Sequence, residues 1–173
     1  GLDLKGRPIL APNSEASVEG QLHFPNMGGA TNWQAPSYDP ATGWLYLAFS
    51  EAGDIYFKEE EKYEPGKPYW GGKAVHAKER VWGGIKAINP ETGKIEWEYK
   101  LVAGNLSAGV LATGGGVLFA SSREGNLLAL DSRSGKLLWK FQAGSDINSS
   151  PMSYAIDGQQ YIVREQPGGW FIT

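Results

Sequence analysis

The sequence predicts an all-β fold made of β-propeller blades, in which four-stranded antiparallel meanders stand side by side around an axis. One observation is a segment that recurs 42 residues further along the chain, close to the period of a propeller blade. A second is a tryptophan at the same position of both copies. The third is a composition with 24 glycines, 10 prolines and 12% aromatic residues, which is typical of short strands joined by tight turns.

The repeated segment is a turn with strands on either side. It runs Ala87-Ile-Asn-Pro-Glu-Thr-Gly-Lys-Ile-Glu-Trp97 and returns as Ala129-Leu-Asp-Ser-Arg-Ser-Gly-Lys-Leu-Leu-Trp139. Its kernel is Asx-x-x-(Thr/Ser)-Gly: the Asx side chain bonds backbone amides ahead of it, and the glycine adopts the left-handed conformation that closes the turn. A weaker copy begins at Tyr38-Asp-Pro-Ala-Thr-Gly43. We therefore expect each kernel to join two strands.

Residues 109–142 are predicted to form one complete blade. Its four strands are expected at Gly109–Thr113, Val117–Ser122, Asn126–Asp131 and Leu137–Gln142. They are separated by Gly114-Gly-Gly116, by Arg123-Glu-Gly125 and by the second kernel.

Residues 34–100 are predicted to form the blade before it. Strands are expected at Gln34–Tyr38, Leu45–Ser50, Gly84–Asn89 and Ile95–Lys100. The polar stretch 51–80 between the second and third of these strands is expected to be a long surface loop. Residues 1–33 form a segment that leads into this blade.

Residues 150–173 are predicted to form part of a third blade. The Asp157-Gly158 pair is a strong signal for a two-residue hairpin turn, with strands at Ser150–Ile156 and Gln160–Glu165. Two further strands are needed to complete the unit. The chain thus holds about two and a half blades.

Trp97 and Trp139 are expected to fill the seams between neighbouring blades, since a flat indole on an outer strand buries a large apolar area. An ordinary β-sandwich is the alternative fold, but it does not account for a tryptophan at a fixed offset from a turn kernel. Propellers typically need 4–8 blades to close. The chain is therefore expected to be a fragment whose partners are the remaining blades or further copies of itself.

Composition excludes several classes of function. Sixteen basic and nineteen acidic side chains give a net charge of −3 without a Lys/Arg block, which argues against nucleic-acid binding. No apolar run approaches the roughly 20 residues that cross a bilayer, so no membrane insertion is expected. The chain has no cysteine, which excludes disulfides, thiolate metal sites and cysteine nucleophiles within it.

Catalytic motifs are weak. His23 and His76 are 53 residues apart, and neither lies near a carboxylate at metal-ligand spacing, so both are expected to be surface or loop residues. The acidic run Glu59–Glu61 is expected to be a solvated loop face. The Gly114–Gly116 run is not a phosphate-binding loop, because no helix is predicted after it.

Several segments resemble one family, the pyrroloquinoline quinone (PQQ)-dependent dehydrogenases of the methanol and ethanol dehydrogenase type, which are eight-bladed propellers of the bacterial periplasm. The repeat ending in Trp97 and Trp139 is similar to that family's tryptophan-docking motif. Gly28-Gly-Ala-Thr-Asn-Trp-Gln-Ala-Pro-Ser-Tyr-Asp-Pro-Ala-Thr-Gly43 is similar to its Gly-x-x-Asn-Trp segment. Gly109-Val-Leu-Ala-Thr113 and Ser150-Pro-Met-Ser-Tyr154 match the blades that follow. The resemblance covers nearly the whole chain and corresponds to the last third of an enzyme.

The resemblance implies the C-terminal part of a periplasmic enzyme that oxidises a small alcohol by hydride transfer to PQQ, with calcium or a lanthanide as Lewis acid and a cytochrome as electron acceptor. Asn32 and Trp33 match the family's Asn-Trp pair beside the quinone, so the fragment would supply one side of the cofactor pocket. The family's metal ligands and catalytic aspartate lie in earlier blades. No catalytic or metal-ligating residue is therefore assigned here, and the fragment alone is expected to be inactive.

The chain departs from the family pattern at two places. Ser107 stands where a tryptophan is common, and Phe24-Pro25 stands where Cys-Pro is usual. Two alternatives stay open. The protein could be a non-catalytic propeller scaffold for protein–protein contacts, and Asn32 could be a loop residue beside a core tryptophan. The aromatic residues of the 51–80 stretch would either pin it to the blade below or face substrate or electron acceptor.

Overall fold

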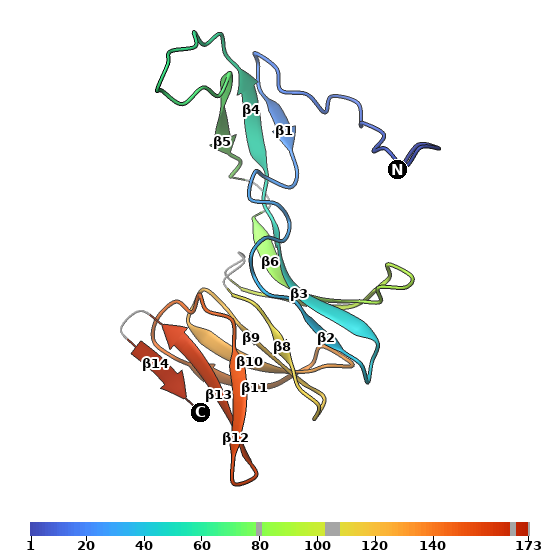
Figure 1. Ribbon diagram of the computed structural model, residues 1–173, viewed down its shortest axis with the longest axis vertical. Helices are drawn as coiled ribbons and strands as arrows, with labels where there is room; N and C mark the ends of the chain where they lie inside the picture. Colours follow the sequence, from blue (N-terminus) through green and yellow to red (C-terminus); the bar gives the residue numbers. More distant parts are fainter. Residues whose placement is uncertain (79–80, 103–107, 167–168, 173) are drawn as a thin grey trace. The chain divides into compact units, whose positions relative to one another are not determined.

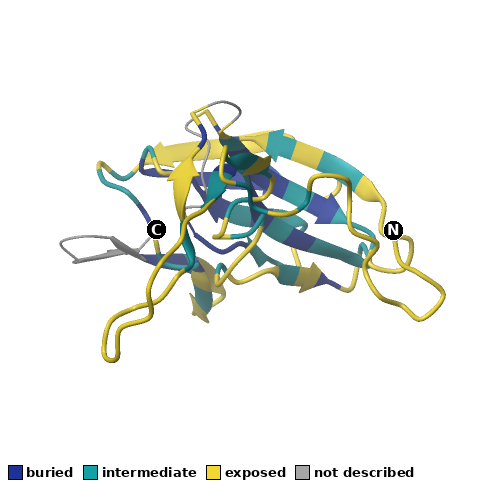
Figure 2. Ribbon diagram, turned by 90° about the horizontal axis from the view of Figure 1, so that it is seen from above, coloured by how far each residue is buried: buried dark blue, intermediate teal, exposed yellow. Residues whose placement is uncertain are grey.

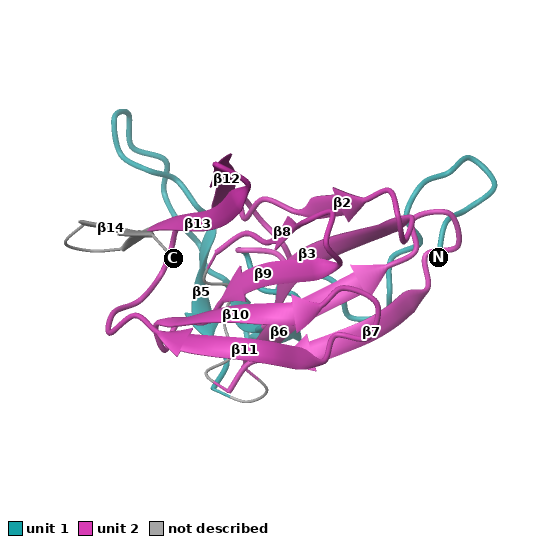
Figure 3. Cartoon of the chain, turned by 90° about the horizontal axis from the view of Figure 1, so that it is seen from below, with its two compact units in different colours: residues 1–27, 52–80 teal, residues 28–51, 81–173 magenta. Residues whose placement is uncertain are grey.

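The computed structural model describes residues 1–78, 81–102, 108–166 and 169–172, with side chains as far as Arg164. Within these ranges the chain forms strands and no helix, and so has no helix that could span a bilayer. It divides into two compact units (Figure 3): unit 1 comprises residues 1–27 and 52–80, and unit 2 comprises residues 28–51 and 81–173.

Unit 2 contains three antiparallel sheets, whose strands are labelled in Figure 1 except for β7, which is labelled in Figure 3. The first has the order β2-β3-β6-β7, with strands Ser37–Asp39, Trp44–Glu51, Trp82–Ile88 and Ile95–Lys100. The second has the order β11-β10-β9-β8, with β8 Leu111–Ala112, β9 Val117–Ser121, β10 Asn126–Asp131 and β11 Leu137–Gln142. The third has the order β12-β13-β14, with strands Met152–Ile156, Gln159–Gln166 and Gly169–Ile172.

The first two sheets are the predicted four-stranded meanders, and the third adds one strand to the predicted hairpin. The first strands of the first two sheets are shorter than the sequence predicted: β2 starts at Ser37 rather than Gln34, and β8 at Leu111 rather than Gly109. The residues just before them are held by other contacts, including the bond from Val110 N to Ala35 O at 3.0 Å. These first strands therefore begin where the loop contacts end.

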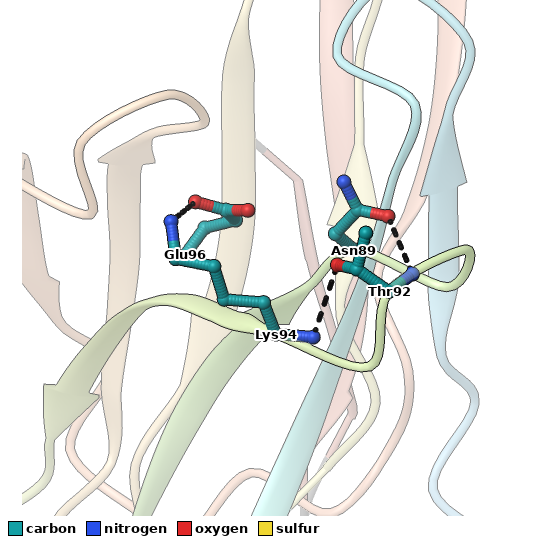
Figure 4. A network of polar contacts seen from close by, with 4 residues as sticks. All are labelled: Asn89, Thr92, Lys94 and Glu96. Atoms are coloured by element: carbon teal, nitrogen blue, oxygen red, sulfur yellow. Dashed lines mark hydrogen bonds and ion pairs between the residues drawn. The ribbon is translucent and has the colours of Figure 1, made fainter.

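The turn kernels have the predicted chemistry. In the first, Asn89 Oδ1 accepts from the amides of Glu91 and Thr92 at 3.0 and 3.2 Å. Figure 4 shows this bond to Thr92, together with the Lys94–Glu96 ion pair that follows at 2.9 Å. Gly93 has φ of 71° and Gly135 has φ of 68°, which is the left-handed region. These kernels join β6 to β7 and β10 to β11. The weaker copy at 38–43 joins β2 to β3, which is a different turn of the blade.

The seam between the first two sheets is packed through Trp97. Its Nε1 donates to Ser132 O at 2.9 Å, and its ring lies so close to Gly135 that an added Cβ would sit 2.6 Å from ring atom Cε3. The Tyr46 hydroxyl donates to the same Ser132 carbonyl at 3.0 Å. Around them lies one apolar core drawn from both sheets: Tyr46, Ala48, Ile85, Ala87, Leu101, Val110, Leu118, Ala120, Leu128 and Leu130. Figure 2 shows the buried residues gathered on these strands.

The seam between the second and third sheets is only partly covered. Leu127, Ile147 and Ile162 form its core. Trp139, which the sequence placed in a seam like Trp97, remains 41% exposed. It borders an open cleft of about 380 Å³ together with Phe119, Leu138 and Ile162. An indole on the outer strand of the second sheet thus lacks the cover that Trp97 has.

The prediction of a surface loop over 51–80 is wrong. Residues Asp54–Lys58 form β4 and Gly72–His76 form β5, and β4 pairs with β5 on one side and with β1, Gln21–His23, on the other. This three-stranded sheet is the centre of unit 1. The residues between β4 and β5 are the loop, and there Glu61 Oε2 accepts from the amides of Trp70 and Gly71 at 2.9 and 2.8 Å.

Candidate functional site

The segments that lead into β2, β8 and β12, the first strand of each sheet of unit 2, are joined by hydrogen bonds from Val110 N to Ala35 O and from Arg164 to Gly109 O and Ser149 O. We call this region the loop end and define it by residues 28–36, 108–110, 122–125, 143–151 and Arg164. The other end, which we call the turn end, carries the kernels and the turns at 113–116 and 157–158. The long connections therefore meet at the loop end, where binding residues of a rigid scaffold commonly lie.

Asn32 and Trp33 lie in the loop before β2. Gly29, with φ of 77°, makes the turn possible, since a Cβ there would stand 2.9 Å from Thr31 O. Asn32 Nδ2 donates to Gly28 O at 2.8 Å, and Ser50 N donates to Ala30 O at 2.8 Å, which ties the loop to the end of β3. Asn32 is exposed and Trp33 is 65% exposed. The bond to Gly28 O agrees with the alternative of a loop asparagine that satisfies backbone, whereas Trp33 lies in no core of the described residues.

Unpaired buried polar atoms concentrate at the loop end. Among the described side chains, four buried nitrogen or oxygen atoms have no hydrogen-bond partner: Gln34 Oε1, Ser145 Oγ, Asp146 Oδ1 and Arg164 Nε. All four belong to the loop end. Buried polar groups are nearly always satisfied in folded proteins, so such a concentration marks a place where further partners are expected.

Arg164 is the most deeply buried charge at this end, with an exposed fraction of 2%. Nη1 donates to Ser121 Oγ at 2.7 Å and to Ser149 O at 3.0 Å, and Nη2 lies 3.5 Å from Gly109 O. Burial lowers the pKa of its guanidinium to about 9. Among the described carboxylates, none forms an ion pair with it.

Unit 1 contains a histidine–carboxylate pair that the sequence reading missed. The register of β1, β4 and β5 places His23 opposite Asp54, and Asp54 opposite His76. The Asp54 carboxylate is 1% exposed and lies 2.6 Å from His76 Nδ1. The histidines were expected to be surface or loop residues, and the His76 side chain is indeed 87% exposed, although both residues stand in strands. Sequence spacing could not reveal the carboxylate beside them, because antiparallel pairing joins residues that are far apart in sequence.

No group of three or more His, Asp or Glu side chains in the described ranges is arranged to hold a metal ion. Unit 1 has an open cleft of about 530 Å³, lined mainly by Met27, Tyr56, Phe57, Trp70 and Lys73. The aromatic residues Tyr63, Tyr69 and Trp70 of the 51–80 stretch are exposed. Trp82 begins β6 and packs edge-on against Phe49 within unit 2. Ser107 lies outside the described residues.

Comparison with known proteins decides the family. A model of the PQQ domain, described as the glucose/ethanol/alcohol dehydrogenase β-propeller domain, matches residues 59–162. The chain belongs to this family. The PQQ-propeller assignment confirms the predicted family resemblance and the predicted fold class.

The relatives of this PQQ propeller chain are longer proteins. It is 36% identical over 171 residues to the quinoprotein alcohol dehydrogenase PedH of Pseudomonas putida, covering 94% of the chain and 29% of PedH. Among solved structures, quinohemoprotein alcohol dehydrogenase ADHIIG from Pseudomonas putida HK5 matches with a TM-score of 0.84 and 26% identity, over 98% of the chain and 27% of that protein. A europium-containing methanol dehydrogenase matches with a TM-score of 0.81 and 25% identity, over 93% and 29%. The chain spans less than a third of each.

The loop before β2 presents one aromatic face and one free amide donor to the surface of unit 2. Trp33 presents an exposed aromatic face, and the amide of Asn32 carries two N–H groups, of which Gly28 O takes one. Gln34, the next residue along, holds an unpaired buried acceptor. Sequence reasoning missed Gln34 and Arg164. For Arg164 a signal existed, because the alternation of a strand places it on the same face as the buried Ile162.

Proposed function

We propose that this chain is the C-terminal part of a PQQ-dependent alcohol dehydrogenase and supplies one side of its cofactor pocket through Asn32 and Trp33. The observation that carries the proposal is the loop before β2, which exposes both side chains at the end of unit 2 where the unpaired buried polar atoms gather. Membership of the PQQ family supports the type of reaction, and the exposed loop before β2 supports the position of the cofactor-binding residues.

Each of the two residues has a distinct task. When bound, PQQ accepts the hydride of an alcohol. The Trp33 indole offers a wall on which a flat ring can stack. The second Asn32 N–H can donate to a carbonyl oxygen that gains negative charge during the reaction, and such donors contribute most where charge develops. Because Gly28 O holds the amide, the donor is oriented before the ligand arrives.

The partners follow from what the described residues leave uncovered. We propose that the remaining blades of the parent propeller, rather than other copies of this chain, cover the exposed Trp139 face of the second sheet. Those blades would also hold the ligands of the calcium or lanthanide ion and the catalytic aspartate, so the isolated chain is inactive. We further propose a small alcohol as substrate, a cytochrome as electron acceptor and the periplasm as the compartment, in keeping with a family that includes a quinohemoprotein.

Substitution of Asn32 in the complete protein tests the site. We expect Asn32→Ala to lower turnover of a primary alcohol about 100-fold, the effect of removing one such donor, with little change in melting temperature because the side chain is exposed. Asn148→Ala is the matched control, since Asn148 is also exposed at the loop end. Equal turnover in both variants would show that Asn32 is only a loop residue. If the wild-type protein binds no PQQ in an absorbance titration, the scaffold alternative is correct.

A further inference from the structure

The guanidinium of Arg164 connects three separate segments of unit 2. Its two terminal nitrogens reach Ser121 at the end of β9, Ser149 before β12 and Gly109 before β8. A guanidinium presents its donors in a fixed planar fork, so it can hold several acceptors in one geometry. Arg164 therefore sets the spacing between the second and third sheets at the loop end.

The contacts continue from there to the loop of Asn32 and Trp33. Ser150 is next to Ser149. A Cβ added to Gly109 would clash with Ser150 Oγ and would stand 2.7 Å from Ala35 O. Val110 N then donates to Ala35 O at 3.0 Å, and Ala112 N donates to Ser37 Oγ at 2.9 Å. Only glycine allows this approach of backbone to backbone at position 109. Ala35 is two residues from Trp33, so a shift at Arg164 is passed on through packed backbone.

Burial of this charge without an acid partner is unfavourable by itself. Taking a cation out of water carries a large desolvation penalty, and Arg164 has neutral oxygens around it and one unpaired nitrogen. A leucine or isoleucine would pack this face at no such penalty. A buried guanidinium is explained if its planar fork is needed to hold the segments of Ser121, Ser149 and Gly109 at a fixed spacing.

We propose that Arg164 is a positioning residue for the cofactor-side loop: its fork fixes Gly109 and Ser149, and these fix Ala35 and thereby the orientation of Asn32 and Trp33. This inference rests on the proposed function for its link to PQQ. The positioning itself is a property of the chain without any ligand. The two can therefore be tested apart.

The test uses the complete protein in three variants. Arg164→Lys keeps the charge but replaces the fork by a compact ammonium group, and Ser121→Ala removes the acceptor of the shortest bond. Leu130→Ala is the control, because Leu130 is fully buried near the opposite end of the second sheet and its loss lowers stability without touching the loop end. Labelling with 5-fluorotryptophan, with Trp33→Phe to assign the resonance, reports on the loop in the apoprotein. Titration with PQQ gives the dissociation constant.

We expect Arg164→Lys and Ser121→Ala to shift or broaden the Trp33 fluorine resonance and to raise the PQQ dissociation constant about tenfold, the equivalent of 1.4 kcal/mol. Leu130→Ala should change neither the Trp33 resonance nor the PQQ dissociation constant, even if it lowers the melting temperature more than Arg164→Lys does. An unchanged Trp33 resonance in Arg164→Lys overturns the inference, as does a loss of affinity no larger than that of Leu130→Ala. If the wild-type protein binds no PQQ, the proposed function is wrong, and the fluorine spectra alone decide the inference.

Discussion

Replacement of Gly135 by alanine tests the seam on which the propeller assignment of this chain depends physically. Gly135 has φ of 68°, a conformation that costs an L-residue about 1–2 kcal/mol. The new Cβ would also stand 2.6 Å from the Trp97 ring, and overpacking of this kind costs about 1–3 kcal/mol. We therefore expect Gly135→Ala to lower the free energy of unfolding by about 2–5 kcal/mol.

The chain contains a matched control for the backbone part of this effect. Gly43 closes a kernel of the same type with φ of 72°, and a Cβ there would meet nothing within 4 Å. Gly43→Ala should therefore lower stability by only about 1–2 kcal/mol. Urea denaturation followed by tryptophan fluorescence and circular dichroism measures both, with the linear extrapolation to water. If the two variants lose equal stability, Trp97 does not rest on Gly135 and the account of the seam fails.

Two further predictions concern the groups around Ser132. Tyr46→Phe removes the hydroxyl that bonds Ser132 O and Thr42, and should lower stability by about 1 kcal/mol. Burial raises the pKa of Tyr46, so its contribution to stability is present below pH 10.0 and is lost as pH rises through the higher folded value; Tyr46→Phe should remove that alkaline loss in urea titrations at stepped pH. Bonds from the Ser134 hydroxyl and amide lower the pKa of Asp131, so Ser134→Ala should raise it in a carbon-detected NMR titration. The lowered pKa of Asp131 contributes stability above pH 3.8 that is lost as pH falls through the folded pKa. In Ser134→Ala this contribution should be smaller, and it should be fully lost at a higher pH than in the wild type. An unchanged Asp131 titration in Ser134→Ala would contradict the assigned cause.

The turns and the strands beside them could be predicted because their causes are local. An Asx residue, a hydroxyl and a glycine at fixed spacing specify the bonds seen at Asn89 and Asp131 without help from the rest of the fold. It holds also for the copy at Tyr38–Gly43, which joins β2 to β3 as expected, the first turn of its blade rather than the last. A kernel thus specifies a turn and leaves open which strands it joins.

The sheet of unit 1 could not be predicted in the same way, because its pairing is not local. Strand β4 pairs with β1 from the beginning of the chain, and with β5 across a loop rich in glutamate, proline and glycine. None of the three strands has a clear alternation of apolar and polar residues. The contact between the buried Asp54 and His76 results from that pairing, so it could not be predicted from the sequence for the same reason.

The candidate site illustrates a related limit. Asn32 and Trp33 entered through family resemblance, and their exposure alone would not distinguish them from other loop residues. What distinguishes their surroundings is the contrast between the two ends of unit 2. At the turn end, Asp131, Asn89 and Ser132 each satisfy the polar groups near them within the same or the next sheet.

At the loop end, by contrast, Gln34, Ser145, Asp146 and Arg164 each keep a buried polar atom without a partner among the described residues. An unsatisfied buried group costs about 1–3 kcal/mol. A sequence that satisfies its polar groups so completely at one end has no difficulty in forming such bonds, so the unsatisfied groups at the other end need a separate cause. Under the proposed function, the remaining blades and a polar cofactor between them would supply that cause, and Arg164 would hold the loops in place to receive them.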